Sequence, residues 1–219
     1  MTRTMAIDGP SGSGKSSVAD RLAQALNMAH LDTGSMYRAI TLDLLEQDIP
    51  VEDADAIRKR LDAVNLTMEP GRVLLNGRDV TKRVREDDVT QKVSVVSGYD
   101  FVRRKLVAMQ QDIAKKQDVI LDGRDIGTVV LPHADLKIFL TAAPEERARR
   151  RLYDKKSTST MDFEQVLADI RRRDAYDSTR AVSPLVQADD AIRIDSTDLE
   201  VEDVVERIIK EWHHVFEMH

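Results

Sequence analysis

The sequence has no cysteine, few aromatic residues and no long apolar run. Without cysteine the chain forms neither disulfide bonds nor thiolate metal sites, which is typical of a reducing compartment. Aromatic residues make up 4% of the sequence, too few for a platform that stacks single-stranded bases. An apolar segment starts at Met5, which leaves no room for a signal peptide, and no run is long enough to span a bilayer. We therefore expect a cytoplasmic protein with no membrane partner.

Basic residues are not in excess either. The 219 residues include 33 Lys and Arg against 39 Asp and Glu, giving a net charge of -6. Duplex binding normally needs clustered basic contacts to phosphates, so we expect no nucleic acid polymer as a partner. A small anionic ligand needs only a local basic cluster. The five histidines lack the spacing of a shared metal site, so we expect them to be surface or core residues. We also expect a monomer.

Short apolar runs alternate with helical patterns along the chain. This alternation is typical of parallel strands joined by crossover helices, so it predicts an α/β sandwich in a single domain. The strand order cannot be read from the sequence. The expected strands are Met5–Asp8, Ala29–Leu31, Val119–Asp122, Lys137–Leu140 and Ala191–Ile194.

Two segments interrupt this alternation. The first runs from about residue 51 to 97, where the turn dipeptides Pro70-Gly71 and Asn76-Gly77 flank strand-like residues and predict a small antiparallel sheet. The second, about residues 154–162, is polar and aperiodic and lies between two arginine-rich helical patterns. Mobile lids have this composition, and so do plain surface loops.

A phosphate-binding loop follows the first expected strand. Residues 9–16 fit the pattern G-x-x-x-x-G-K-[ST] at each fixed position, and an amphipathic helix follows them. The loop's N–H groups and the helix N-terminus would hold the phosphates of a nucleoside triphosphate, with Lys15 beside the β and γ phosphates and Ser16 on Mg²⁺. The expected nucleotide-binding residues are Gly9, Pro10, Ser11, Gly12, Ser13, Gly14, Lys15, Ser16 and Ser17.

Other polar segments follow expected strands. The segment from Asp122 to Asp125 leaves an apolar strand at the sheet edge where α/β proteins bind ligands, so a functional role is favoured over a plain turn. Arg38, one turn into the helix after Asp32, is either a solvated residue or a phosphate clamp. The arginines at 147, 150 and 151 share a helical face, and those at 171–173 precede two aspartates. The two groups of arginines form either solvated faces or a clamp for a transferring phosphoryl group.

Together, four motifs resemble the bacterial cytidylate kinases, nucleoside monophosphate kinases with a P-loop. The motifs are the phosphate loop, D-T-G-S-M-Y-R at 32–38, D-G-R-D-I-G-T at 122–128 and R-A-V-S-P-L at 180–185. The resemblance implies ATP-dependent phosphorylation of CMP and dCMP, with UMP a poorer acceptor. It also implies a three-layer fold with a five-stranded parallel sheet. The core would cover about residues 1–50, 104–150 and 163–219, the acceptor-binding insertion about 51–103 and the lid about 151–162.

The resemblance also implies roles for individual residues. Thr33 stands where some members have serine, and the expected lid carries Lys155 and Lys156 rather than arginines, so Arg147 and Arg151 are better candidates for contacting ATP. The implied catalytic residues are Lys15, Arg124, Arg151 and Arg180, and Arg147 joins the ATP-binding set. The implied acceptor-binding residues are Thr33, Arg38, Ser94, Arg103, Arg124, Asp125, Arg173, Asp177 and Arg180.

These roles agree with elementary chemistry. The Asp125 carboxylate can accept from the exocyclic amine of cytosine, whereas uracil has a carbonyl oxygen there. A kinase for another small acceptor, such as a shikimate-like acid, remains an alternative. A GTP-dependent switch is disfavoured because the sequence has no N-K-x-D motif. A nucleotide-binding regulator without turnover would leave the many arginines unexplained.

Overall fold

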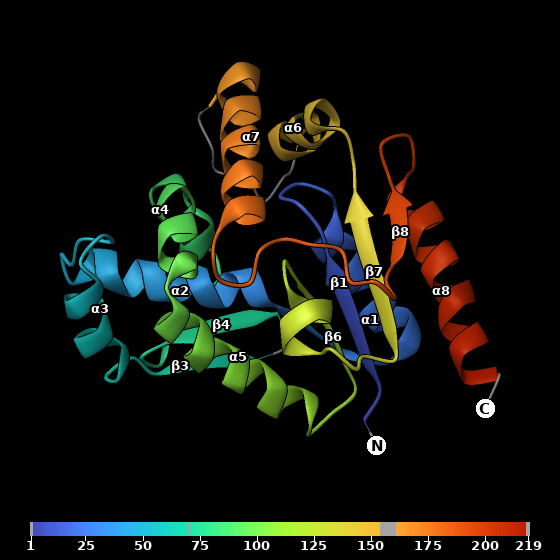
Figure 1. The fold of residues 1–219 in the computed structure, drawn as a ribbon, viewed down its shortest axis with the longest axis horizontal. Helices are drawn as coiled ribbons and strands as arrows, with labels where there is room; N and C mark the ends of the chain where they lie inside the picture. Colours follow the sequence, from blue (N-terminus) through green and yellow to red (C-terminus); the bar gives the residue numbers. More distant parts are fainter. Residues whose placement is uncertain (1, 70, 154–160, 218–219) are drawn as a thin grey trace.

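A five-stranded parallel sheet forms the centre of the fold (Figure 1). The computed structural model describes residues 2–69, 71–153 and 161–217. The strand order is β2-β6-β1-β7-β8, and each predicted strand is confirmed to within one residue at either end. The strands are β1 (Thr4–Asp8), β2 (Ala29–Asp32), β6 (Val119–Gly123), β7 (Leu136–Thr141) and β8 (Ile192–Asp195).

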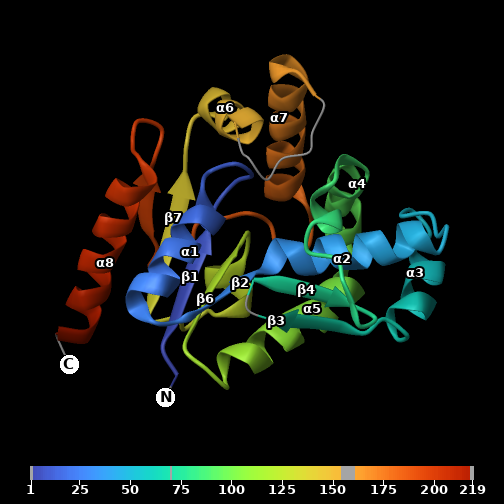
Figure 2. The same cartoon turned by 180° about the vertical axis from the view of Figure 1, so that it is seen from behind.

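Helices cover both faces of this sheet (Figures 1 and 2). Because successive strand residues point to opposite faces, Met5 and Ile7 of β1 join one core cluster and Ala6 joins another. The first cluster includes α1 (Lys15–Leu26) and α8 (Val201–Glu217). The second includes α2 (Thr33–Glu46) and α5 (Asp100–Ala114). Burial on both faces explains why these strands read as continuous apolar runs, and it confirms the three-layer α/β fold.

The small antiparallel sheet is also confirmed. It has the order β3-β4-β5, and positive φ angles of 50° at Asn76 and 79° at Gly77 form the turn before its last strand. Its apolar side chains join the same core cluster as α2, which fixes this sheet beneath α2. The elements are α3 (Ala54–Leu61), β3 (Leu66–Glu69), β4 (Arg72–Leu75), β5 (Arg78–Asp79), the 3₁₀ turn η1 (Arg83–Arg85) and α4 (Asp87–Gly98).

Two helices stand over the carboxyl edge of the sheet. They are α6 (Pro144–Tyr153) and α7 (Phe163–Thr179), which pack through Ala148, Val166 and Ile170. Of the predicted lid at about 151–162, residues 154–160, with Lys155 and Lys156, lie outside the described residues. The domain boundaries stay predictions, and α5 runs across the one expected near residue 103.

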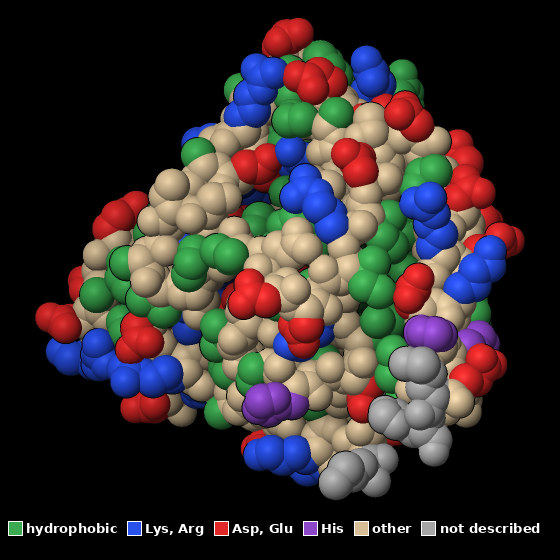
Figure 3. All heavy atoms as spheres, turned by 45° about the vertical axis from the view of Figure 1, so that its right-hand side comes forward, with side chains coloured by type: hydrophobic (Ala, Val, Ile, Leu, Met, Phe, Trp, Pro, Cys, Tyr) green, Lys and Arg blue, Asp and Glu red, His purple; other side chains and the backbone are tan. Residues whose placement is uncertain are grey.

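Acidic and basic side chains are interspersed over the face shown in Figure 3. This mixture agrees with the modest net charge of -6. Within residues 2–69, 71–153 and 161–217, no helix combines the length and apolarity that a membrane crossing requires.

Candidate active site

The phosphate loop joins β1 to α1 and curls around its own lysine. Gly12 has φ +78°, and a Cβ atom there would lie 3.1 Å from Arg147 Cβ, so the position needs glycine. The Lys15 ammonium is buried and donates to the Pro10 carbonyl at 2.7 Å. Burial, together with repulsion by Arg124, lowers the pKa of Lys15 to about 7. A bound polyphosphate would restore the charge of this lysine.

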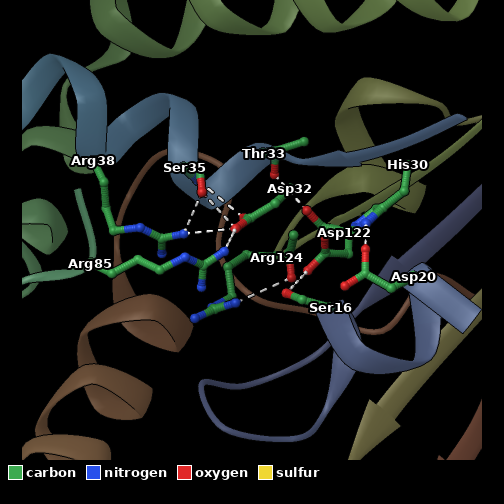
Figure 4. A network of polar contacts seen from close by, with 11 residues as sticks. Ser16, Asp20, His30, Asp32, Thr33, Ser35, Arg38, Arg85, Asp122 and Arg124 are labelled. Carbon is green, nitrogen blue, oxygen red and sulfur yellow. Dashed lines mark hydrogen bonds and ion pairs between the residues drawn. The ribbon is translucent and has the colours of Figure 1, made fainter. Parts of the chain in front are cut away.

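The hydroxyl of Ser16 lies against the neighbouring strand β6. It donates to Asp122 Oδ2 at 3.0 Å, and the other oxygen of Asp122 is 2.7 Å from His30 Nε2 (Figure 4). The sequence had marked the segment starting at Asp122 as functional without giving Asp122 itself a role. The contact arises because β6 inserts between β1 and β2, which pairs Asp122 with Ile7 on one side and Asp32 on the other.

A second cluster surrounds the end of β2, where Arg38 and Arg85 converge on Asp32 (Figure 4). Asp32 Oδ2 accepts from Arg38 Nη2 at 2.8 Å and from Arg85 Nη2 at 3.1 Å. Although burial acts to raise the pKa of Asp32, the two guanidinium groups hold it well below its usual range. Sequence reasoning missed Arg85, which comes from η1 in the insertion. In the sequence Arg85 is one of several basic residues in this segment, and nothing there distinguishes it from the others.

The loop after β6 carries two further predicted residues. Arg124 Nε donates to Asp177 Oδ2 of α7 at 2.8 Å. Asp125 is buried and forms an ion pair with Arg103 of α5. Arg180 lies 3.9 Å from Asp125 Oδ1 and 3.8 Å from Asp177 Oδ1. The structure thus brings together predicted residues that are more than 70 positions apart in the sequence.

Several arginine donors in this region are buried without a hydrogen-bond partner in the described part of the chain. They are Nε of Arg38, Arg103 and Arg173, and Nη2 of Arg180. Burial and repulsion by neighbouring arginines lower the pKa of Arg173 to about 10. A buried donor without a partner is costly, so the convergence of these donors points to an anionic ligand with several oxygen atoms.

The remaining acceptor residues border this cluster. Thr33 Oγ1 donates to the carbonyl of Asp122 at 2.7 Å, so in this structure its hydroxyl holds the strand end. Ser94 is buried on α4, one turn before Ser97, whose carbonyl accepts from Arg103 at 3.0 Å. The ring of Tyr37 lies 5.1 Å from the Arg103 guanidinium. Hydrogen-bond donors and acceptors from several elements therefore surround Asp125.

The arginines of α6 diverge, contrary to the shared face that their spacing suggested. Arg147 donates to Ser11 O at 3.0 Å and to Asp174 at 2.7 Å, and Arg151 binds Asp169 at 2.9 Å. Arg150 turns away toward Ser196 at 3.0 Å, because the loop after β8 offers it oxygen acceptors. Only Arg147 and Arg151 of this set therefore face α7.

A cavity of about 390 Å³ lies between the phosphate loop and the segment after β8. Its lining joins Ser13, Gly14 and Ser17 to Arg150 and to the segment after β8, residues 196–201. The sequence had suggested Ser17 but none of the residues after β8, which have the composition of an ordinary surface loop.

The comparisons with known proteins agree with this geometry. The family model described as cytidylate kinase matches residues 5–214. A cytidylate kinase of Caldanaerobacter subterraneus subsp. tengcongensis is 49% identical over 209 residues, covering 95% of this chain and 93% of the relative. One of Fusobacterium nucleatum subsp. nucleatum is also 49% identical, covering 94% and 95% of the two chains.

The fold extends to more distant kinases. A shikimate kinase of Bacteroides thetaiotaomicron has a TM-score of 0.51 and 12% identity, covering 96% of this chain and 98% of that one, which supports the P-loop kinase fold alone. The family model and the relatives confirm the resemblance seen in the sequence. The chain belongs to the cytidylate kinase family.

Proposed function

We propose that this chain is a nucleoside monophosphate kinase that transfers the γ-phosphoryl group of ATP to CMP and dCMP. Membership of the cytidylate kinase family supports ATP-dependent phosphorylation of CMP. The observation that carries the acceptor assignment is the Arg103–Asp125 ion pair, which lies beside arginine donors that have no hydrogen-bond partner in the described part of the chain. Asp125 can accept from the cytosine amine while Arg103 donates to the ring acceptors, a pattern that uracil cannot match fully.

The donor nucleotide would bind across the phosphate loop. The backbone N–H groups of residues 9–16 and Lys15 would hold the phosphates, and the cavity beside Ser17 would take the adenosine end. Ser16 would hold Mg²⁺, and the site fits this ion because a hydroxyl with a carboxylate oxygen 3.0 Å behind it offers hard oxygen atoms at the loop. When bound, Mg²⁺ would offset charge on the β and γ phosphates.

The acceptor would lie at the carboxyl edge of the sheet. Arg38 and Arg124 would hold its phosphate, and Thr33 lies at the strand end, where its hydroxyl donates to the Asp122 carbonyl. Ser94, Arg103 and Asp125 would bind the base, and Arg173 and Asp177 the sugar. On binding, the oxygen atoms of the acceptor would offer partners to the arginine donors that have none.

In the transfer step, an oxygen of the acceptor phosphate attacks the γ phosphorus in line as the bond to the β–γ bridging oxygen breaks. ADP leaves, and CMP gains the phosphoryl group. Lys15, Arg124, Arg151 and Arg180 would stabilise the charge that spreads over the moving group. Arg147 holds the loop through Ser11 and would keep the donor aligned. An ionised phosphate oxygen is already a nucleophile, so no general base is required.

Initial rates of ADP formation test this proposal. Mg-ATP is offered with CMP, dCMP, UMP, AMP, GMP, shikimate or no acceptor. We expect fast turnover with CMP and dCMP and slower turnover with UMP. A preference for another acceptor would overturn the pocket around Asp125, and equal ADP formation without any acceptor would overturn the kinase assignment.

A further inference from the structure

His30 has no part in the mechanism above, yet it lies directly behind the phosphate loop. Its ring is held between two carboxylates, with Nδ1 2.6 Å from Asp20 Oδ1 and Nε2 2.7 Å from Asp122 Oδ1 (Figure 4). The His30 side chain is 12% exposed and Asp122 is 4% exposed, whereas Asp20 on α1 is half exposed. The contacts therefore run from the surface through His30 to Asp122 and on to Ser16.

The two short contacts specify the state of the ring. An ionised carboxylate only accepts hydrogen bonds, so both ring nitrogens must carry hydrogen, and the ring is an imidazolium. Burial opposes this charge, but the hydrogen bonds to Asp122 and Asp20 raise the pKa of His30 to about 10. A fixed positive charge thus lies behind a carboxylate that itself faces the polyphosphate site.

We propose that His30 is a positioning residue for phosphoryl transfer, which holds the Asp122 carboxylate so that its second oxygen binds the Ser16 hydroxyl. The inference rests on the proposed function, because Ser16 matters here as the residue that would hold Mg²⁺. Asp122 Oδ2 has its contact with Ser16 only while Oδ1 is engaged by His30, because a carboxylate without this anchor rotates about its terminal torsion.

Asp20 is the surface end of this series of contacts. It holds the ring through Nδ1, and the ring links it to Asp122 (Figure 4). Its effect on the reaction should therefore pass through His30. Sequence reasoning had treated His30 as a surface or core residue, because nothing in the sequence links position 30 to position 122.

The kinetic test replaces His30 by leucine, which fills similar space without a donor, and by glutamine, which keeps one donor without the charge. We expect His30→Leu to lower kcat by about tenfold or more, because partners of metal-site residues typically contribute 10–100-fold. KM for CMP should stay unchanged, since His30 has no contact with the acceptor residues, and His30→Gln should recover part of kcat. His213→Leu, an exposed histidine of α8, is the matched control.

A binding measurement separates positioning from general damage. Calorimetry with the non-hydrolysable analogue AMPPNP compares the affinity in Mg²⁺ with the affinity in EDTA. In His30→Leu we expect the gain from Mg²⁺ to shrink by about tenfold while the affinity in EDTA holds. Wild-type kcat together with a wild-type Mg²⁺ gain in His30→Leu would overturn the proposal. So would equal losses in the Leu and Gln variants.

Asp20→Ala gives a test at a half-exposed position. Alone it should lower kcat by a few fold, and in the His30→Leu background it should lower kcat no further, because Asp20 acts through the ring. Additive losses would overturn the proposal. A wild-type chain that does not phosphorylate CMP would instead overturn the proposed function, so the two failures are distinct.

Discussion

At the scale of single residues, Asp125 is the group that we propose to distinguish an exocyclic amine from a carbonyl. Asp125→Asn puts an amide there, which both donates and accepts, so it can satisfy either base. We expect the ratio of kcat/KM for CMP to kcat/KM for UMP to fall toward one or to invert. Breaking the buried pair with Arg103 will also reduce stability and so the fraction of active enzyme. The ratio is therefore the useful measurement, because it does not depend on that fraction. An unchanged ratio would mean that cytosine is recognised elsewhere.

Lys15 should affect rate without supporting the fold. Burial, together with repulsion by Arg124, lowers the pKa of its ammonium to about 7, so the folded chain disfavours this charge before ATP binds. Lys15→Met should therefore lower kcat/KM by a factor of about 10² to 10³, as for other donors to developing charge, with an unchanged or higher midpoint in urea. Lys59→Met, at an exposed site of α3, is the control. Near wild-type turnover in Lys15→Met would contradict the donor site.

At the scale of elements, the N-terminus of α7 lies where the predicted lid ends. Asp162 accepts from Gln165 N at 2.9 Å, and Gln165 Oε1 accepts from Asp162 N at 3.0 Å, which completes a capping box. Asp162→Ala should cost about 1 kcal/mol in the free energy of unfolding, and Asp162→Asn, which keeps the cap, much less. Urea titration of the three proteins measures the difference. Equal losses in both variants would mean that the cap itself contributes little.

The strands could be predicted from the sequence because buried parallel strands need apolar side chains on both faces. The runs around Met5, Val119 and Lys137 are therefore continuous and end where polar residues begin. The turn at Asn76-Gly77 was predicted for a similar local reason, since few other residues adopt its positive φ angles. Strand ends and turns depend on the residues at those positions, so they can be predicted from the sequence directly.

The contacts of Asp122 and Arg85 could not be predicted in this way. Asp122 meets Ser16 only because β6 lies between β1 and β2, an order that the apolar runs do not specify. Arg85 reaches Asp32 only because the insertion folds back over α2. The resemblance implied roles for Arg103 and Asp125, but their ion pair depends on how α5 packs. Individual site residues were thus predictable, and their partners were not.

At the scale of the whole molecule, the fold shifts the pKa values of two basic groups near the phosphate loop in opposite directions. His30 has a pKa raised to about 10 from 6.5, and Lys15 has one lowered to about 7 from 10.5. Between pH 7 and 10 the folded state therefore holds more protons at His30 than the unfolded chain does, and fewer at Lys15. The stability that His30 contributes is lost as pH rises through 10, whereas the penalty from Lys15 is relieved over the same range.

These two slopes, each up to about 1.4 kcal/mol per pH unit, should nearly cancel in the wild-type protein without nucleotide or metal. His30→Gln removes the falling term, so its stability relative to wild type should rise from pH 7 to 10. Lys15→Met removes the rising term, so its relative stability should fall. Urea titrations in EDTA, followed by the fluorescence of the buried Trp212, measure both differences. Parallel profiles for the three proteins would mean that neither group changes its proton affinity on folding, because the common titration of all other groups cancels in the comparison.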